Sequence, residues 1–240
     1  MKTPKFDVIG HRGAMGLAPE NTLLSFKKAL EIGVDGVEFD VQNIDDELLV
    51  FHDDTLDRTT NGCGRLLDYS LNDLRQLDAG QGEKIPLLAE VIELIGDKAF
   101  INIELKGINT ASLVMKLVKL LDKRRFKKEQ FIISSYHFSE LYLIYEFDPE
   151  IRIGVIADDQ PIIAFDFADE INAYSFHPSY SMLNQALIEQ AHSTGMKVYV
   201  HTVNELDKIQ NSRELGADGI FTDYPDRVRD FLANERAGEM

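Results

Sequence analysis

Three carboxylates lie on two short apolar segments at spacings that would bring them together. In DGVEFDV, residues 35–41, Glu38 and Asp40 alternate with apolar residues, and in FINIELKG, residues 100–107, Glu104 does the same. Because successive side chains of a strand point to opposite faces, each segment has one apolar and one acidic face. Converging carboxylates raise one another's pKa unless a cation joins them, and all-oxygen ligand sets suit Mg²⁺ or Ca²⁺. The pattern therefore predicts one divalent cation at these acids.

Two histidines and two basic side chains accompany the acids. His11 and Arg12 follow the strand-like segment FDVIG, and Lys106 closes the second acidic segment. A hairpin that turns at residues 45–46 would place His52 nearly opposite the first acidic pair, where cross-strand side chains approach closely. Paired imidazoles can supply a general base and a general acid, and guanidinium and ammonium groups bind phosphate. We therefore expect acid–base chemistry on a phosphate group.

The elements that must position these residues alternate between short apolar strands and amphipathic helices, which is typical of a parallel sheet. The expected strands are Phe6–Ile9, Gly36–Gln42, Glu47–His52, Phe100–Leu105, Phe131–Ser134, Arg152–Ile156, Ile171–Ser175, Lys197–His201 and Gly219–Thr222. The third strand follows the second too closely for a crossover helix, so the two should form an antiparallel hairpin. Without that returning strand, eight remain, the number in a closed (β/α)8 TIM barrel.

The domain organisation follows from the same pattern. We expect one TIM-barrel domain over residues 1–240, because no linker, repeat or low-complexity tract interrupts the chain. The segment at about residues 53–86 has no strand pattern and is predicted to be a small insertion after the hairpin. Helices are expected at Thr22–Ile32, which ends before a glycine, and at Leu183–Ser193.

Composition limits the partners. Of the 240 residues, 44% are hydrophobic and 28% charged, which is ordinary for a globular protein. The net charge of −16, from 25 Lys and Arg against 41 Asp and Glu, disfavours nucleic acid and stable association with anionic membranes. A single cysteine, Cys63, cannot form an internal disulfide, and the N-terminus has no long apolar core, so we expect a cytoplasmic protein that acts on a small molecule.

Six long motifs follow one another in a fixed order: HRG with PENT, VEFDV, VFHDDTLDRTTNGCG, IELKG, VYVHTVN and GIFTDYP. Together they resemble the glycerophosphodiester phosphodiesterase family over nearly the whole chain. The resemblance implies a (β/α)8 barrel with a small insertion after the HD pair, in agreement with the strand pattern. It also implies hydrolysis of glycerophosphodiesters, such as glycerophosphocholine or glycerophosphoethanolamine, to an alcohol and sn-glycerol 3-phosphate.

The same resemblance implies residue roles. These are acid–base catalysis by His11 and His52, binding of one Mg²⁺ or Ca²⁺ by Glu38, Asp40 and Glu104, and phosphate binding by Arg12 and Lys106. Glu20 and Asn21, in PENT, would position other site residues, with capping of the following helix as an equal alternative. Where the family usually has Trp-Thr, this chain has His201-Thr202 and contains no tryptophan. We therefore expect His201 to alter the wall that faces the substrate alcohol.

Two other functional classes are compatible with these motifs. A phospholipase-type phosphodiesterase, or a lyase that releases a cyclic phosphate, would use the same barrel, and the identity of the product separates them from hydrolysis to glycerol 3-phosphate. A barrel that only binds a ligand is disfavoured, because both histidines and all three acids are present.

Overall fold

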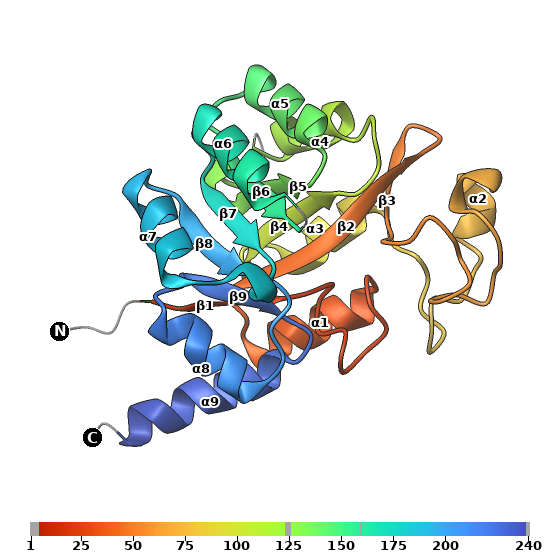
Figure 1. The fold of residues 1–240 in the computed structure, drawn as a ribbon. Helices are drawn as coiled ribbons and strands as arrows, with labels where there is room; N and C mark the ends of the chain where they lie inside the picture. Colours follow the sequence, from red (N-terminus) through yellow and green to blue (C-terminus); the bar gives the residue numbers. More distant parts are fainter. Residues whose placement is uncertain (1–4, 123–125, 159, 239–240) are drawn as a thin grey trace.

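The computed structural model describes residues 5–122, 126–158 and 160–238, and within them a parallel sheet closes on itself as a (β/α)8 barrel (Figure 1). The barrel strands are β1 (Asp7–Gly10), β2 (Gly36–Ile44), β4 (Phe100–Leu105), β5 (Phe131–Ser135), β6 (Arg152–Ala157), β7 (Ser175–Pro178), β8 (Lys197–Val200) and β9 (Gly219–Thr222). Parallel pairing of β1 with both β2 and β9 closes the ring. The predicted TIM barrel is therefore confirmed.

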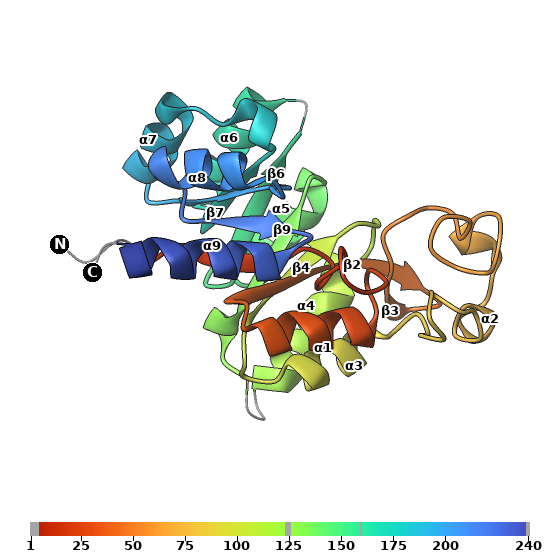
Figure 2. The same cartoon turned by 90° about the horizontal axis from the view of Figure 1, so that it is seen from below.

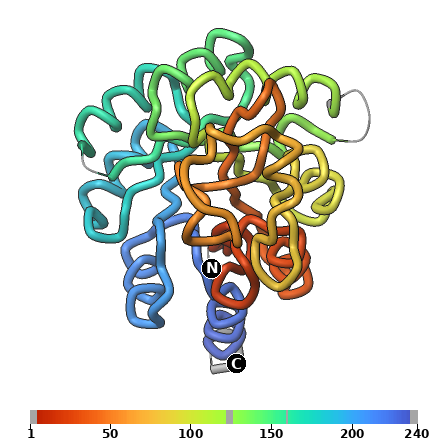
Figure 3. The backbone as a smooth tube through the Cα atoms, turned by 90° about the vertical axis from the view of Figure 1, so that its right-hand side faces the viewer, coloured from red at the N-terminus to blue at the C-terminus, as the bar shows by residue number. Residues whose placement is uncertain are grey.

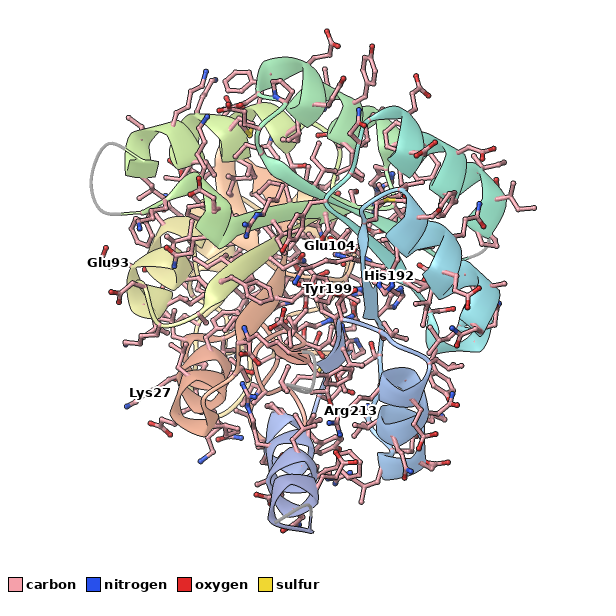
Figure 4. All side chains as sticks on the ribbon, turned by 90° about the vertical axis from the view of Figure 1, so that its left-hand side faces the viewer. Lys27, Glu93, Glu104, His192, Tyr199 and Arg213 are labelled. Carbon is pink, nitrogen blue, oxygen red and sulfur yellow. The ribbon has the colours of Figure 1, made fainter. Side chains whose placement is uncertain are left out.

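Helices surround the barrel, as Figures 1 and 4 show. They are α1 (Leu23–Ile32), α3 (Leu88–Ile95), α4 (Ala111–Asp122), α5 (Phe138–Phe147), α6 (Pro161–Glu170), α7 (Gln185–Ser193), α8 (Leu206–Glu214) and α9 (Pro225–Gly238). Helix α1 illustrates how the sequence sets their ends. The Thr22 side chain accepts a hydrogen bond from the backbone of Ser25, and Gly33 ends the helix at a φ of 83°, a conformation that costs glycine little.

The alternation of side chains along β2 separates its two environments. Val37, Phe39 and Val41 are fully buried in the hydrophobic core between strands and helices. Glu38 and Asp40 point into the barrel, and their backbones pair with Asn102 and Glu104 of β4. The apolar face thus anchors the strand, and the polar face is held in a fixed position.

The interior of the barrel is apolar at one level and polar at the next. Ile9, Ile132, Tyr199 and Phe221 form a separate buried cluster inside the ring, with Phe100 packed against it. Because consecutive inward residues lie two apart, the next inward positions along β4 and β5 are Asn102 and Ser134, which hydrogen bond to each other. The apolar cluster closes one end, so the polar groups face an opening at the carboxyl ends of the strands.

The hairpin and the insertion lie at that open end. Strand β3 (Glu47–Val50) pairs antiparallel with β2, and residues 51–87 then form an irregular segment that contains η1 (Leu66–Asp68) and the short helix α2 (Leu71–Leu74). The segment packs around its own small hydrophobic core, which includes Leu56 and Leu66. Figures 1 and 3 place it at the end of the barrel where β2 ends, and Figure 2 shows α9 extending from the opposite side.

Several expected strands have different bounds in the structure, and two of these differences concern histidines of the cavity. The strand predicted at Ile171–Ser175 is shifted and runs over Ser175–Pro178, since residues 172–174 connect α6 to it. The strand predicted at Glu47–His52 ends at Val50, so His52 follows the strand rather than closing it. Short 3-10 turns, η2 (Lys128–Gln130) and η3 (Tyr180–Met182), precede β5 and α7. In the described ranges, none of the helices combines the length and apolar character needed to span a bilayer.

Candidate active site

The three predicted carboxylates converge inside the barrel. Glu38, Asp40 and Glu104 each offer an oxygen, and these oxygens all lie within 4.8 Å of one another. Glu38 and Asp40 are almost completely buried, and Glu104 is partly exposed toward the opening. Figure 4 shows Glu104 near the middle of the ring of helices, whereas Lys27 and Glu93 lie at its outer edge. Two strands in register therefore create the acidic cluster that their alternation predicted.

The electrostatics of this cluster favour a bound cation. Burial, followed by the charges of Asp40 and Glu104, raises the pKa of Glu38 well above its ordinary value. Burial and Asp40 likewise raise the pKa of Glu104 to about 7. Oε1 of Glu38 is buried without a hydrogen-bond partner among the described residues. An unsatisfied carboxylate oxygen between other carboxylates fits a hard divalent cation, because such ions take oxygen ligands.

Arg12 and Lys106 flank the acids on the side of the opening. The backbone N–H of Arg12 donates to Oε2 of Glu38 at 2.8 Å, and its guanidinium lies 3.4 Å from Asp40. Arg12 adopts a φ of 49°, and at the following Gly13 a Cβ would approach Ser25 Oγ to 2.4 Å. This tight turn directs the Arg12 backbone toward the acids. Lys106 Nζ lies 3.2 Å from Glu104, and the acids outweigh burial and raise the pKa of this lysine.

Each predicted catalytic histidine is held through Nδ1 by a carboxylate. Nδ1 of His11 lies 2.7 Å from Oδ1 of Asp223, and Nδ1 of His52 lies 2.6 Å from Oδ1 of Asp53. Asn204 donates to the other oxygen of Asp223 at 2.7 Å, which fixes that carboxylate in turn. Burial lowers the pKa of His52 and so favours its neutral form. The arrangement orients both rings and leaves Nε2 as the nitrogen available to a substrate.

The PENT motif supports the neighbouring groups. Glu20 accepts from the Arg12 guanidinium at 2.6 Å, and Asn21 donates to Oδ2 of Asp40 at 2.9 Å. The cap of α1 is Thr22, so helix capping does not explain the two residues before it. Instead, Glu20 contacts the Arg12 side chain and Asn21 contacts Asp40 of the acidic cluster.

The opposite wall of the barrel carries His201 and His177. Nε2 of His201 lies 3.4 Å from Oδ1 of Asp158, and burial lowers the pKa of this histidine. His177 hydrogen bonds through Nε2 with Ser175 Oγ at 2.8 Å, and burial lowers its pKa to about 3. The strand expected at Ile171–Ser175 leaves His177 outside it, but His177 lies within β7, where Gly154 of β6 leaves space for its ring.

These groups surround one cavity of about 220 Å³. Its lining includes seven of the ten residues singled out from the sequence, namely His11, Arg12, Glu38, His52, Glu104, Lys106 and His201, and it also includes His177. Asp40 and Asn21 lie behind this lining and Glu20 lies beside it, at 2.6 Å from Arg12. The structure therefore brings the sequence-predicted residues together at one place.

Sequence reasoning missed three contributors. Asp223 and Asp53 orient the histidines, and Arg58 binds both Asp53 and Glu20. Asp53 and Arg58 stand in the motif VFHDDTLDRTTNGCG, and Asp223 in GIFTDYP. A pairing rule that seeks one carboxylate for each candidate histidine would have pointed to Asp53, which is the next residue, but not to Asp223.

The chain matches the family model for the glycerophosphoryl diester phosphodiesterase family over residues 11–227. It is 39% identical over 232 residues to a glycerophosphodiester phosphodiesterase of Caldanaerobacter subterraneus subsp. tengcongensis, covering 92% of this chain and 95% of that protein. A glycerophosphodiester phosphodiesterase of Bacillus subtilis is 32% identical, covering 91% of this chain and 83% of that one. Among solved structures, an Oleispira antarctica phosphodiesterase in complex with the product sn-glycerol-3-phosphate has a TM-score of 0.86 and 30% identity, covering 95% and 96% of the two chains.

Proposed function

Because this chain belongs to the glycerophosphoryl diester phosphodiesterase family, we propose that it hydrolyses a small glycerophosphodiester to an alcohol and sn-glycerol 3-phosphate. The proposed reaction depends on one divalent cation and two histidines. One observation carries this proposal: Glu38 and Glu104 of the acidic cluster and the two carboxylate-held histidines line the same cavity. A binding protein would need neither arrangement.

The cation follows from charge. The chain carries a net charge of −16, the substrate is an anion, and three carboxylates lie where its phosphate must bind. We propose that Glu38, Asp40 and Glu104 hold one Mg²⁺ or Ca²⁺. When bound, the ion would offset these charges, bind a phosphate oxygen and stabilise the charge that develops during reaction.

The remaining residues then have distinct tasks. Arg12 and Lys106 flank the cluster and would hold the phosphate by charge-assisted hydrogen bonds. His11 and His52 would act through Nε2, one taking a proton from the nucleophile and the other giving one to the leaving alcohol. Asp223 and Asp53 stabilise the orientation and the protonated form of each ring.

The test removes the cation and identifies the product. Protein stripped with a chelator, and verified by elemental analysis, is assayed on glycerophosphocholine and glycerophosphoethanolamine before and after Mg²⁺ or Ca²⁺ is restored. We expect activity to fall to background and to return with the ion, and phosphorus NMR to show sn-glycerol 3-phosphate. Choline phosphate or a cyclic phosphate as the product would instead support the phospholipase-type or lyase alternative.

A charge-matched variant locates the cation. The triple variant Glu38→Gln, Asp40→Asn, Glu104→Gln should lose tight binding of the ion. The control removes three exposed acids elsewhere, Glu31→Gln, Glu47→Gln and Asp207→Asn, and should keep it. Full activity in verified cation-free protein would exclude the cation requirement, and tight binding by the first variant would exclude this site.

A further inference from the structure

We propose that Arg58, on the insertion, is a positioning residue for the active site. By binding Glu20 and Asp53 at the same time, it holds the groups that orient Arg12 and His52. The proposal deepens the proposed function, since it rests on that function for the roles of Arg12 and His52. It assigns the insertion a part in building the site.

The guanidinium of Arg58 joins two carboxylates from separate parts of the chain. Its Nε donates to Oδ2 of Asp53 at 2.7 Å, and its Nη1 donates to Oε2 of Glu20 at 2.6 Å. Nη2 donates to both acids, at 2.8 Å to Glu20 and 2.9 Å to Asp53. All three nitrogens are therefore used, which the fixed fork of arginine allows and a lysine ammonium cannot reproduce.

Each of these carboxylates holds one residue of the proposed machinery. Oε1 of Glu20 also accepts from Nη1 of Arg12 at 2.6 Å, and Oδ1 of Asp53 also contacts Nδ1 of His52 at 2.6 Å. A continuous chain of hydrogen bonds thus runs from Arg12 through Glu20, Arg58 and Asp53 to His52. It connects the first barrel strand with the residues after the hairpin.

The charges in this chain balance only when Arg58 is present. Arg12 and Arg58 are cations and Glu20 and Asp53 are anions, so the four sum to zero. Arg58, through its hydrogen bonds, is the main reason that the pKa of Asp53 falls below its usual range. Glu20 and Asp53 both accept from Nη2 of Arg58, so without Arg58 these two carboxylates would repel each other and move apart. Movement of Glu20 would displace Arg12, and movement of Asp53 would displace His52.

Arg58 has a matched counterpart in the same segment. Arg75 binds both oxygens of Glu90 at 2.7 Å and also donates to the backbone oxygen of Ile85. It therefore attaches the insertion to α3 with a comparable fork, and among the described residues it makes no hydrogen bond or ion pair with the proposed machinery. Substitution of Arg75 therefore measures how much activity and stability are lost when the insertion is loosened without a change at Arg58.

The first measurement compares the two arginines. We expect Arg58→Gln to lower kcat/KM for glycerophosphocholine by about 10- to 100-fold, the scale for small displacements of reacting groups. Arg58→Lys should recover little of this loss. Arg75→Gln and Arg75→Lys should change kcat/KM less than about twofold, although Arg75→Gln lowers the melting temperature. Equal losses for Arg58→Gln and Arg75→Gln would overturn the proposal.

A second measurement tests whether Arg58 acts through its two partners. In a Glu20→Gln, Asp53→Asn background, Arg58→Gln should reduce kcat/KM by less than about threefold further, because the groups it positions are already altered. If Arg58 only stabilised the fold, Arg58→Gln would reduce kcat/KM by the same factor in that background as in the unmodified protein. An additive loss would therefore contradict the positioning role.

The last measurement needs no activity. Nitrogen-15 spectra of histidine-labelled protein, assigned with a His52→Gln variant, report which ring nitrogen of His52 carries the proton. We expect the Nδ1–H form, directed at Asp53, to predominate in the unmodified protein and in Arg75→Gln, and the Nε2–H form to increase in Arg58→Gln. If the unmodified enzyme hydrolyses no glycerophosphodiester, the proposed function fails while this spectrum still tests Arg58. An unchanged His52 tautomer in Arg58→Gln overturns the positioning role.

Discussion

The two sides of the cavity differ in charge although they belong to one barrel. Around β1, β2 and β4, most lining residues are ionisable and several contact one another directly, as Arg12 does with Glu38 and Lys106 with Glu104; we call this the charged side. Along β6 to β9, most of the lining is uncharged, with His177 and His201 beside Phe221, although Asp158 adds a half-exposed carboxylate; we call this the neutral side. Burial lowers the pKa of both these histidines and so favours their neutral forms.

This difference in charge leads us to expect that the two sides contact different parts of the substrate. A phosphodiester carries its charge on the phosphate, and its two ester groups are neutral or, for a choline head group, cationic. In the proposed reaction, the charged side would bind the phosphate and the neutral side would face the rest of the molecule. Changes on the charged side should therefore affect the rate of phosphorus chemistry, whereas changes on the neutral side should affect which alcohol is preferred.

The two sides are also held in place differently. Side chains on the charged side depend on long-range ion pairs that reach the insertion, through Arg58 and Glu20. The neutral side depends on packing inside the barrel, where the His177 ring fills space above Gly154 and contacts Phe221 edge to face. The first arrangement is sensitive to charge and the second to volume.

The largest effect should come from the histidines on the charged side. We expect His11→Ala and His52→Ala each to lower kcat by about 100-fold or more, the scale for loss of a general acid or base. Circular dichroism and the melting temperature should show that both variants fold. The matched control is His192→Ala on α7, where the side chain is half-exposed and pairs with Asp218. Near-normal turnover in either variant would remove that histidine from the acid–base pair.

A smaller effect should appear in the dependence of cation binding on pH. Because the pKa of Glu104 is raised to about 7, its proton competes with the ion below that pH. Apparent affinity for Mg²⁺ or Ca²⁺ should therefore fall by about tenfold per pH unit as the pH drops from 7 to 5. Calorimetric titrations across this range measure the slope, and Glu104→Gln should make it shallower.

The raised pKa of Glu104 also predicts how the stability of the cation-free protein depends on pH. A carboxyl whose pKa is raised on folding binds its proton more tightly in the folded state than in the unfolded chain. Its stabilising contribution is therefore present below its ordinary pKa of about 4.3 and is lost as the pH rises toward 7. The melting temperature of cation-free protein, compared with that of Glu104→Gln, should fall as the pH rises through this window. A constant difference between the two, together with a flat binding curve, would contradict the raised pKa.

The sequence indicated that the side chains of the charged side lie close together, because that signal is local. Alternation within six or seven residues determines which face of β2 carries Glu38 and Asp40, and the same holds for β4. The short hairpin connection limits where His52 can lie, and Phe51, the residue before it, donates from its backbone to the Asp40 carbonyl oxygen. Fold class follows from the same periodicity, repeated along the chain.

The residues that complete the site could not be found this way. Asp223 pairs with His11 across 212 positions of sequence, and Arg58 reaches Glu20 across 38. Such contacts depend on barrel closure and on how the insertion packs, which no local pattern encodes. The expected strand Ile171–Ser175 left His177 out for a related reason, because apolar residues just before β7 resemble a strand.

The smallest effect, and the one that tests the neutral side, concerns His201. Its ring lies 6.5 Å from that of Phe221, and its Nε2 faces the half-exposed Asp158. His201→Trp would remove the partner of Asp158 and place an aromatic face at the cavity wall, which favours a quaternary ammonium group through cation–π attraction. We expect kcat/KM for glycerophosphocholine to rise about three- to tenfold relative to that for glycerophosphoglycerol.

The control for this measurement is a second substitution of His201 that keeps the wall polar. His201→Gln keeps a polar group at the wall and should leave the ranking of choline, ethanolamine and glycerol head groups within about twofold of the original. If His201 belonged instead to the proton-transfer machinery, His201→Trp would lower kcat for all three substrates by a similar factor of about 100. A uniform loss of that kind, or an unchanged ranking, would remove the distinction between a charged side that performs the reaction and a neutral side that selects the alcohol.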